Sequence, residues 1–163
     1  MMPEKGKSMK TTLNPIKMFQ EGNIIYFDPF YFKNGNTAKP KYFVVLKSYG
    51  TNSVIASLPT RKDSIPTDNT IEYGCVELPN INLNCFVIPS HHIATECGKQ
   101  FDFNTYLYGH QIDDYNITTI KEIYPNEGSD YIVWGKLKSK LFSELIDCFK
   151  NSKSVKRKYK RLL

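Results

Sequence analysis

The chain has 163 residues, of which 40% are hydrophobic and 23% are charged. This composition excludes a disordered or fibrous protein, and the length suffices for one domain with its own hydrophobic core. Aromatic residues make up 13% of the chain. Because wide, flat side chains suit pleated, half-buried surfaces, the composition favours strands over helices.

The net charge of +6 is concentrated at the C-terminal end of the chain. Of the 22 basic residues, six follow Asn151 with no acidic residue among them, and the remaining 16 equal the 16 acidic residues of the whole chain. The body is therefore neutral, and a basic surface on it must come from local clustering. The basic segment has two interpretations, which are contact with nucleic acid and a solubilising end.

The cysteines and the apolar runs indicate the compartment. Cys75, Cys85, Cys97 and Cys148 form no Cys-x-x-Cys pair. Residues 1–17 lack the apolar core of a signal peptide, and no apolar run reaches the length that spans a bilayer. We therefore expect free thiols, a cytoplasmic location and no contact with a membrane.

The predicted elements begin after a polar arm at residues 1–18. Short apolar runs bounded by Gly, Pro, Asn or Asp predict strands at residues 23–27, 42–47, 53–58, 71–78, 85–88, 105–108 and 131–134. The second strand is apolar on successive residues, which predicts burial on both faces. A short turn at residues 49–52 joins it to the third strand, so these two strands are predicted to form a hairpin.

Two later segments have helical periodicity. Leucine or phenylalanine recurs every four residues from Leu137 to Phe149, which predicts an amphipathic helix that ends near Asn151. Residues 113–124 are ambiguous, because Ile117, Ile120 and Tyr124 also fit one face of a short helix.

These elements predict a mainly β fold of the α+β class. The expected architecture is a small barrel or a strongly bent antiparallel sheet with a C-terminal amphipathic helix. A single domain is expected over residues 19–150, between the flexible N-terminal arm at 1–18 and the basic C-terminal tail at 151–163.

The predicted hairpin brings basic residues together. Lys39 precedes the second strand, and Thr60 and Arg61 follow the third, so these residues are expected at one end of the sheet with Lys41 and Lys62 beside them. A cationic cluster with a hydroxyl group can hold a phosphodiester and stabilise the charge that develops on it. Cleavage also requires a base for the attacking hydroxyl and an acid for the leaving oxygen. The alternative interpretation is a set of solvated loop charges.

Aromatic residues provide a second candidate contact with nucleic acid. Phe30 and Tyr31 lie next to Phe32 and Lys33, and exposed rings beside cations can stack on unpaired bases. The alternative is that one or two of these rings fill the core.

Zinc-ligand residue types occur in the second half of the chain, at Cys85, His91, His92, Cys97 and His110. Their spacing matches no zinc motif, and a glycine-rich phosphate loop is also missing from the sequence. We therefore predict no metal site and no cofactor.

The order of the motifs resembles the PemK/MazF family of toxins from toxin–antitoxin systems. The motifs that carry the resemblance are Gly22-Asn23-Ile24-Ile25-Tyr26-Phe27, a loop with Gly35, Lys39-Pro40 before a Val/Leu-rich strand, a Thr near the end of the third strand, Gln111-Ile112, and Gly135-Lys136-Leu137 before the last helix. The resemblance covers residues 20–62 and 108–150 and leaves the segment 71–104 unaligned.

The resemblance implies an SH3-like barrel that forms a homodimer, cuts single-stranded RNA without a metal ion and is silenced by an antitoxin protein. It implies that Lys39 holds the phosphate, that Thr60 or Arg61 completes the site, and that Gln111 supports the site or the dimer contact. The RNA 2′-hydroxyl would then be the nucleophile, leaving a cyclic phosphate.

This sequence departs from the family pattern at three places. The family's Arg falls on Lys39, its Thr aligns with Pro59 or Thr60, and its Gly-Asp is Gly22-Asn23 here. Lysine keeps the charge but loses the planar, two-pronged donor geometry of arginine. Three functions therefore remain open, which are a toxin-type endoribonuclease, a nucleic-acid-binding module without catalysis, and a protein-interaction domain.

Overall fold

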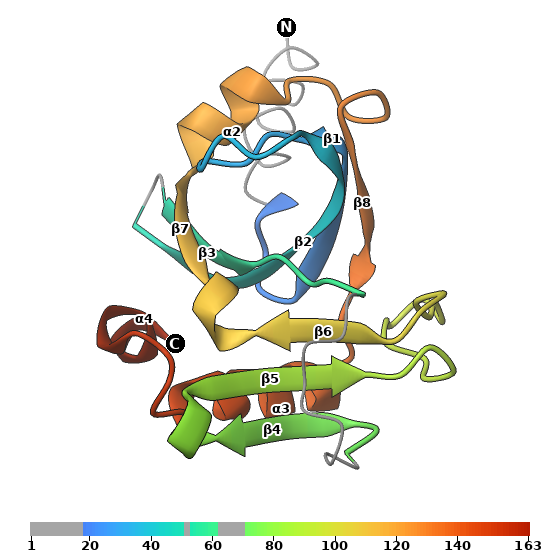
Figure 1. Cartoon of the computed structure of the whole chain (residues 1–163). Helices are drawn as coiled ribbons and strands as arrows, with labels where there is room; N and C mark the ends of the chain where they lie inside the picture. The colour runs from blue at the N-terminus through green and yellow to red at the C-terminus, as the bar shows by residue number, and fades with distance from the viewer. Residues whose placement is uncertain (1–17, 51–52, 62–70) are drawn as a thin grey trace, which may run out of the picture.

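The computed structural model describes residues 18–50, 53–61 and 71–163, which form a mainly β fold of the α+β class (Figure 1). The strands in these ranges are β1 (Asn23–Phe30), β2 (Lys39–Tyr49), β3 (Ser53–Ser57), β4 (Gly74–Leu78), β5 (Leu83–Ile88), β6 (Thr105–Tyr108), β7 (Asp113–Asn116) and β8 (Tyr131–Lys136). The helices are α2 (Ile117–Ile123), α3 (Ser139–Lys150) and α4 (Arg157–Leu162), with short 3-10 turns η1 (Pro79–Ile81) and η2 (Gly109–Gln111). Of the arm predicted at residues 1–18, residues 1–17 lie outside the described ranges, and Met18 is buried in a core cluster.

The strands form two antiparallel sheets. One has five strands in the order β7-β3-β2-β1-β8, and the other has three in the order β4-β5-β6 (Figure 1). They do not close into a barrel, so the expectation of a closed SH3-like barrel is wrong. The physical reason is that β4 and β5, from the segment that the resemblance left unaligned, pair with each other and with β6 as a separate sheet. An antiparallel bridge joins Tyr106 of β6 to Thr60, which follows β3 of the larger sheet.

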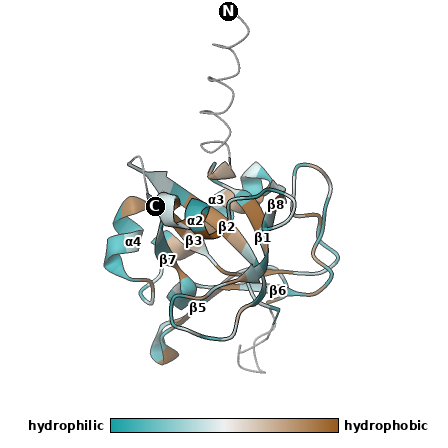
Figure 2. Cartoon of the chain, turned by 90° about the horizontal axis from the view of Figure 1, so that it is seen from above, coloured by the Kyte–Doolittle hydropathy of each residue, from teal (hydrophilic) through white to brown (hydrophobic). Residues whose placement is uncertain are grey.

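The central strands of the larger sheet are buried on both faces. Along β2, Val44 and Leu46 belong to a cluster with α3, whereas Phe43 and Val45 belong to a second cluster with α2. This confirms the predicted two-sided burial of the second strand, and the pairing of Val44 with Ser57 confirms the predicted hairpin. Hydrophobic residues concentrate on β1 and β2 in Figure 2, whereas α4 is largely hydrophilic.

Two predicted strands are longer than their apolar runs. β1 continues through Asp28-Pro29 to Phe30, with a register shift against β2 after Phe27. β2 already begins at Lys39, because Lys39 pairs with Phe30 across the sheet. The ambiguous segment 113–124 contains both a strand, β7, and the short helix α2, whose first turn is capped by the Asn116 side chain. Lys39, a basic residue of the candidate site, therefore belongs to strand β2 and not to a loop.

The last predicted helix is confirmed as α3. Its apolar face is buried at Leu141, Leu145, Cys148 and Phe149, and it packs on β4 and β5 (Figure 1). No helix in the described ranges has the length and hydropathy that a membrane crossing requires.

The basic segment 151–163 packs on the domain instead of extending from it. Val155 and Tyr159 are buried in the cluster that contains α3. The Tyr159 hydroxyl donates to Asp113 Oδ1 of β7 at 3.2 Å, and the Ser152 hydroxyl donates to Glu77 Oε1 of β4 at 2.8 Å. The packed unit therefore extends beyond the expected boundary at residue 150.

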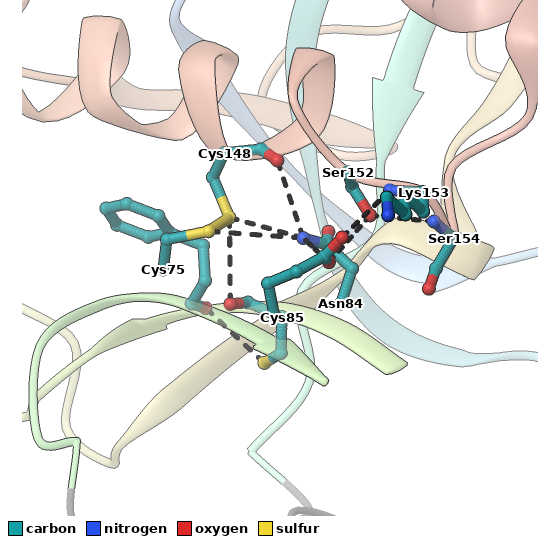
Figure 3. Close-up of a disulfide and its surroundings, with 9 residues drawn as sticks. Cys75, Asn84, Cys85, Cys148, Ser152, Lys153 and Ser154 are labelled. Carbon is teal, nitrogen blue, oxygen red and sulfur yellow. Dashed lines mark hydrogen bonds between the residues drawn. A yellow bond between two sulfur atoms is a disulfide. The ribbon is translucent and has the colours of Figure 1, made fainter. Parts of the chain in front are cut away.

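A disulfide joins Cys75 of β4 to Cys148 of α3, with their Cα atoms 5.5 Å apart (Figure 3). The expectation of free thiols is therefore wrong for these two residues, and it holds for Cys85 and Cys97. The bond forms because α3 packs across β4, which the 73-residue separation along the chain does not reveal. The buried Asn84 amide donates to the backbone oxygen of Cys148 and to Glu77, and so ties the same region together.

Removing the disulfide is expected to lower the free energy of unfolding by about 2–4 kcal/mol, because the cross-link restricts a long loop in the unfolded chain. Urea unfolding of a Cys75→Ala/Cys148→Ala variant, followed by fluorescence of Trp134, measures this difference. Cys97→Ala is the control, since that thiol is exposed and free. Equal unfolding midpoints and slopes for the oxidised protein and the double variant would contradict the expectation.

Candidate functional site

A surface pocket of about 490 Å³, called pocket 1 here, lies where β2 begins and β3 ends. Lys39, Lys41, Thr60 and Arg61 all line it. Their convergence follows from the hairpin: since Val44 pairs with Ser57 in antiparallel register, the residues after Ser57 return beside the residues before Val44. The structure thus brings together the residues that hairpin geometry placed at one end of the sheet.

The opposite wall of pocket 1 comes from the segment before β6. Phe101, Asp102, Phe103 and Thr105 line the pocket, and the Thr60–Tyr106 bridge holds this segment against the end of β3. The bridge has two backbone hydrogen bonds, of 2.9 Å and 2.7 Å. Sequence reasoning missed this wall, because its position depends on a contact between strands of different sheets.

Two aromatic hydroxyl groups also line pocket 1. The rings of Tyr26 and Tyr42 lie 5.0 Å apart, and these residues pair across β1 and β2. Burial, assisted by the charges of Tyr26 and Asp102, raises the pKa of Tyr42 above its usual value. The Tyr42 phenol therefore stays protonated at neutral pH and can donate a hydrogen bond to an anion.

Lys41 is the most perturbed cation of pocket 1. Lys39 and Lys41 are two residues apart on β2, so their side chains leave the same face of the strand. Burial, and secondarily the charge of Lys39, lowers the pKa of Lys41 from 10.5 to about 8. A lysine in this range can accept a proton near neutral pH, whereas an ordinary surface lysine stays charged.

Arg61 is exposed at the rim of pocket 1. Its guanidinium carbon lies 4.7 Å from the ring centroid of Phe103, and 56% of the Phe103 side chain is exposed. This cation–π contact orients a planar donor beside a flat apolar surface. Pocket 1 therefore combines two amines, a guanidinium, several hydroxyl groups, a carboxylate and an open aromatic face.

A second pocket, called pocket 3 here, adjoins pocket 1 and has a volume of about 780 Å³. The two pockets share Lys39, Lys41 and Thr60 as lining residues. Gln111 lines pocket 3 from η2, and its buried Oε1 atom has no hydrogen-bond partner within the described part of the chain. The structure therefore places Gln111 in a neighbouring pocket and not in pocket 1 itself.

The two predicted stacking residues differ in exposure. Phe30 is 3% exposed and packs against Phe27 and Tyr124, so its ring belongs to the core and its face is closed to a base. Tyr31 is 56% exposed and stacks on Tyr124 with ring centroids 6.0 Å apart. Tyr31 lines a third pocket of about 530 Å³, called pocket 2 here. The stacking hypothesis is thus wrong for Phe30 and still open for Tyr31.

Two other predictions concern Lys62 and a metal site. Lys62 lies outside the described ranges, so its predicted place beside Lys41 stays a prediction. Among the residues that the structure describes, no three His, Cys, Asp or Glu side chains are grouped as a metal site would need. Of the zinc-type residues, Cys85 is buried and Cys97 is exposed.

No protein-family model matches this sequence, and a search of curated proteins finds no match either.

Proposed function

We propose that pocket 1 binds a phosphodiester of single-stranded RNA and cleaves it by attack of the neighbouring 2′-hydroxyl, as an endoribonuclease that needs no metal ion. The observation that carries the proposal is the Lys39–Lys41 pair facing Thr60 and Arg61 in one pocket. This set supplies positive charge for the phosphate, and Lys41 supplies a group that can change its protonation near neutral pH.

Each residue has a role in a balanced reaction. The neutral amine of Lys41 accepts the proton of the 2′-hydroxyl, whose oxygen forms the new bond to phosphorus. Arg61 and the Thr60 hydroxyl donate hydrogen bonds to the phosphate oxygens as their negative charge increases. The ammonium of Lys39 donates a proton to the departing 5′-oxygen. The products are a 2′,3′-cyclic phosphate and a free 5′-hydroxyl. Proton exchange with water then returns Lys41 to the neutral amine and Lys39 to the ammonium.

The resemblance to PemK/MazF toxins supports the same reaction, since Lys39 and Thr60 fall near the family's phosphate-binding Arg and Thr. The homodimer and the antitoxin partner remain predictions of that resemblance. A cellular single-stranded RNA substrate would place the protein in the cytoplasm. Because disulfides are rare in the cytosol, activity should be assayed both with and without a thiol reductant.

The proposal predicts that the purified protein cuts a mixed pool of single-stranded RNA in the presence of a metal chelator. A DNA oligonucleotide with one internal ribonucleotide should be cut only after the ribonucleotide, because only that sugar carries a 2′-hydroxyl. Mass spectrometry of the products measures the cyclic phosphate. Expression of the protein should also slow cell growth.

A Lys39→Ala variant purified in the same way controls for contaminating ribonucleases. If the wild-type protein leaves the pool intact and has no effect on growth, the cleavage proposal is rejected. Tight, salt-dependent binding of RNA without cleavage would instead identify a binding module on the same fold.

A further inference from the structure

Three pockets adjoin one another along one face of the molecule. Pocket 1 shares Lys39, Lys41 and Thr60 with pocket 3, and pocket 3 shares Lys33, Asp113 and Tyr115 with pocket 2. Because neighbouring pockets have side chains in common, they lie side by side, and together they are called the groove here, with Phe103 in pocket 1 and Tyr31 in pocket 2. Their combined volume exceeds what a single phosphodiester requires.

Positive charge occurs along the whole groove. Arg61, Lys39 and Lys41 line pocket 1, Lys156 lines pocket 3, and Lys158 lines pocket 2. Lys156 and Lys158 belong to the basic C-terminal segment, which is docked beside β7 through the hydrogen bond from Tyr159 to Asp113 (Figure 1). The basic segment is therefore held where two of its amines face the groove.

Two acidic residues of the groove, Asp113 and Asp114, have partners within the protein, and a third, Asp102, lines pocket 1. Asp113 forms an ion pair with Lys33 at 3.3 Å, and it also accepts the Tyr159 hydroxyl. Asp114 accepts a hydrogen bond from the Tyr49 hydroxyl. Lys33 is thus partly neutralised at the junction of pockets 2 and 3, and Lys156 and Lys158 are the cations that the C-terminal segment adds to these two pockets.

An open aromatic ring lies at each end of the groove. Phe103 in pocket 1 and Tyr31 in pocket 2 are each 56% exposed, although large aromatic side chains are usually buried. Phe103 lies under the Arg61 guanidinium, and Tyr31 is backed by Tyr124. Cationic grooves with exposed rings are the arrangement that binds unpaired strands, since the charges follow the backbone and the rings stack on bases.

We propose that the groove formed by pockets 1, 3 and 2 holds an extended single strand of RNA, with Lys156 and Lys158 of the C-terminal segment contacting its phosphates and with Phe103 and Tyr31 stacking on its bases. This inference deepens the proposed function and rests on it, because pocket 1 defines where the scissile phosphate lies. It assigns the basic C-terminal segment to the substrate-binding site.

The test measures binding of an unpaired oligonucleotide of about 12 nucleotides, a length within the range of single-strand binding sites. Its sugars carry 2′-fluorine, so the strand cannot attack itself and binding is measured without cleavage. Fluorescence anisotropy over a range of salt concentrations gives the affinity and its salt dependence. The same strand annealed to its complement, and a dinucleotide that fills only pocket 1, are measured alongside.

The decisive variants are Lys156→Gln/Lys158→Gln and Arg157→Gln/Arg161→Gln. Both pairs remove two charges from the same segment, but Arg157 and Arg161 line none of the three pockets. The lysine pair should reduce the slope of log affinity against log salt by about 1.4, at about 0.7 for each phosphate contact, whereas the arginine pair should change it little. Tyr31→Ala and Phe103→Ala should each weaken binding about 5- to 150-fold.

Separate outcomes address the groove and the cleavage proposal. The groove is supported if the lysine pair weakens binding of the long strand but not of the dinucleotide, even when the wild-type protein cuts no RNA. Equal effects of the two variant pairs, or binding of the duplex as tight as that of the single strand, would overturn it. In that case cleavage that depends on Lys39 would still stand.

Discussion

Replacing Lys41 with arginine should lower the rate of RNA cleavage by about 10²- to 10⁴-fold, which is the usual contribution of a general base. Arginine keeps the positive charge in pocket 1, but its pKa is too high for it to accept a proton. Binding of the 2′-fluoro strand should therefore change little. Single-turnover cleavage of the DNA oligonucleotide with one ribonucleotide measures the rate, and Lys47→Arg is the control on the same strand. Lys47 lies outside the three pockets and pairs with Glu21.

The pH dependence of cleavage tests whether Lys41 acts as a base. A base must be neutral to act, and with a pKa of about 8 roughly one Lys41 side chain in ten is neutral at pH 7. kcat/KM should therefore rise about tenfold per pH unit up to pH 8 and then level off. The bound phosphate favours the charged amine, so the profile of kcat should be displaced to higher pH. A flat profile in the wild-type protein would contradict the assigned role.

Protein stability provides an independent readout of the lowered pKa. The pKa of Lys41 is about 8 in the folded protein and 10.5 in the unfolded chain, so the unfolded chain binds more protons between these two values. The free energy of unfolding should therefore increase as the pH rises through this window. In the Lys41→Arg variant this part of the increase should be missing, because arginine stays charged in both states. Urea unfolding at several pH values measures the difference between the two proteins.

Replacing Lys39 with glutamine should lower the cleavage rate by about 10²- to 10³-fold, the usual cost of removing one group that stabilises charge in the transition state. Lys39 lies at the junction of pockets 1 and 3, with its amine 5.9 Å from the ring centroid of Phe32. The slope of log affinity against log salt should also decrease by about 0.7 if Lys39 contacts one phosphate. Lys121→Gln is the matched control, because Lys121 is exposed on α2 and outside the pockets.

The same assay resolves which residue takes the place of the family's threonine. Pro59 and Thr60 both line pocket 1, but only Thr60 carries a hydroxyl. Thr60→Val keeps the shape of the side chain and removes that hydroxyl. A decrease in rate with unchanged binding would support the role of Thr60, whereas an unchanged rate would leave Arg61 as the group that completes the site. Cleavage that survives in Lys39→Gln at the wild-type rate would contradict the role of Lys39.

Strand periodicity and turn residues predict the central part of this fold well. The apolar runs that become β1, β2 and β3 are bounded by Gly, Pro and Asn, and their order along the chain matches their order in the sheet. The four-residue spacing from Leu137 to Phe149 likewise predicts α3. These features are local, so propensity and periodicity are sufficient to find them.

The features that the sequence does not reveal depend on contacts between distant segments. The wall of pocket 1 at Phe101 to Thr105 and the Cys75–Cys148 disulfide both require the second sheet to be placed against the first sheet and α3. No local pattern contains that information. The docked C-terminal segment is a different case, because Val155 and Tyr159 are four residues apart and form its buried face. That spacing is the one signal in a segment otherwise dominated by charge.

The residues of the candidate site also divide into those that a local pattern predicts and those that depend on contacts between distant segments. Lys39, Thr60 and Arg61 converge because a hairpin alone brings them to one end of the sheet. Asp102, Phe103 and Lys156 could not be assigned, since they reach the groove from segments that pack only in the folded protein. Phe30 and Tyr31 are neighbours in sequence, yet the Phe30 ring is buried and the Tyr31 ring is open, because Phe30 ends β1 and packs in the core, whereas Tyr31 follows the end of the strand.

The most direct test of pocket 1 as the RNA site is an NMR titration of the 15N-labelled protein with the 2′-fluoro single strand. The account predicts concentration-dependent shifts of the backbone amides of Lys39, Lys41, Arg61 and Phe103, with no comparable shifts on β4, which lines none of the three pockets. Unchanged amides around pocket 1 at saturating RNA, or shifts confined to β4 and α3, would contradict it.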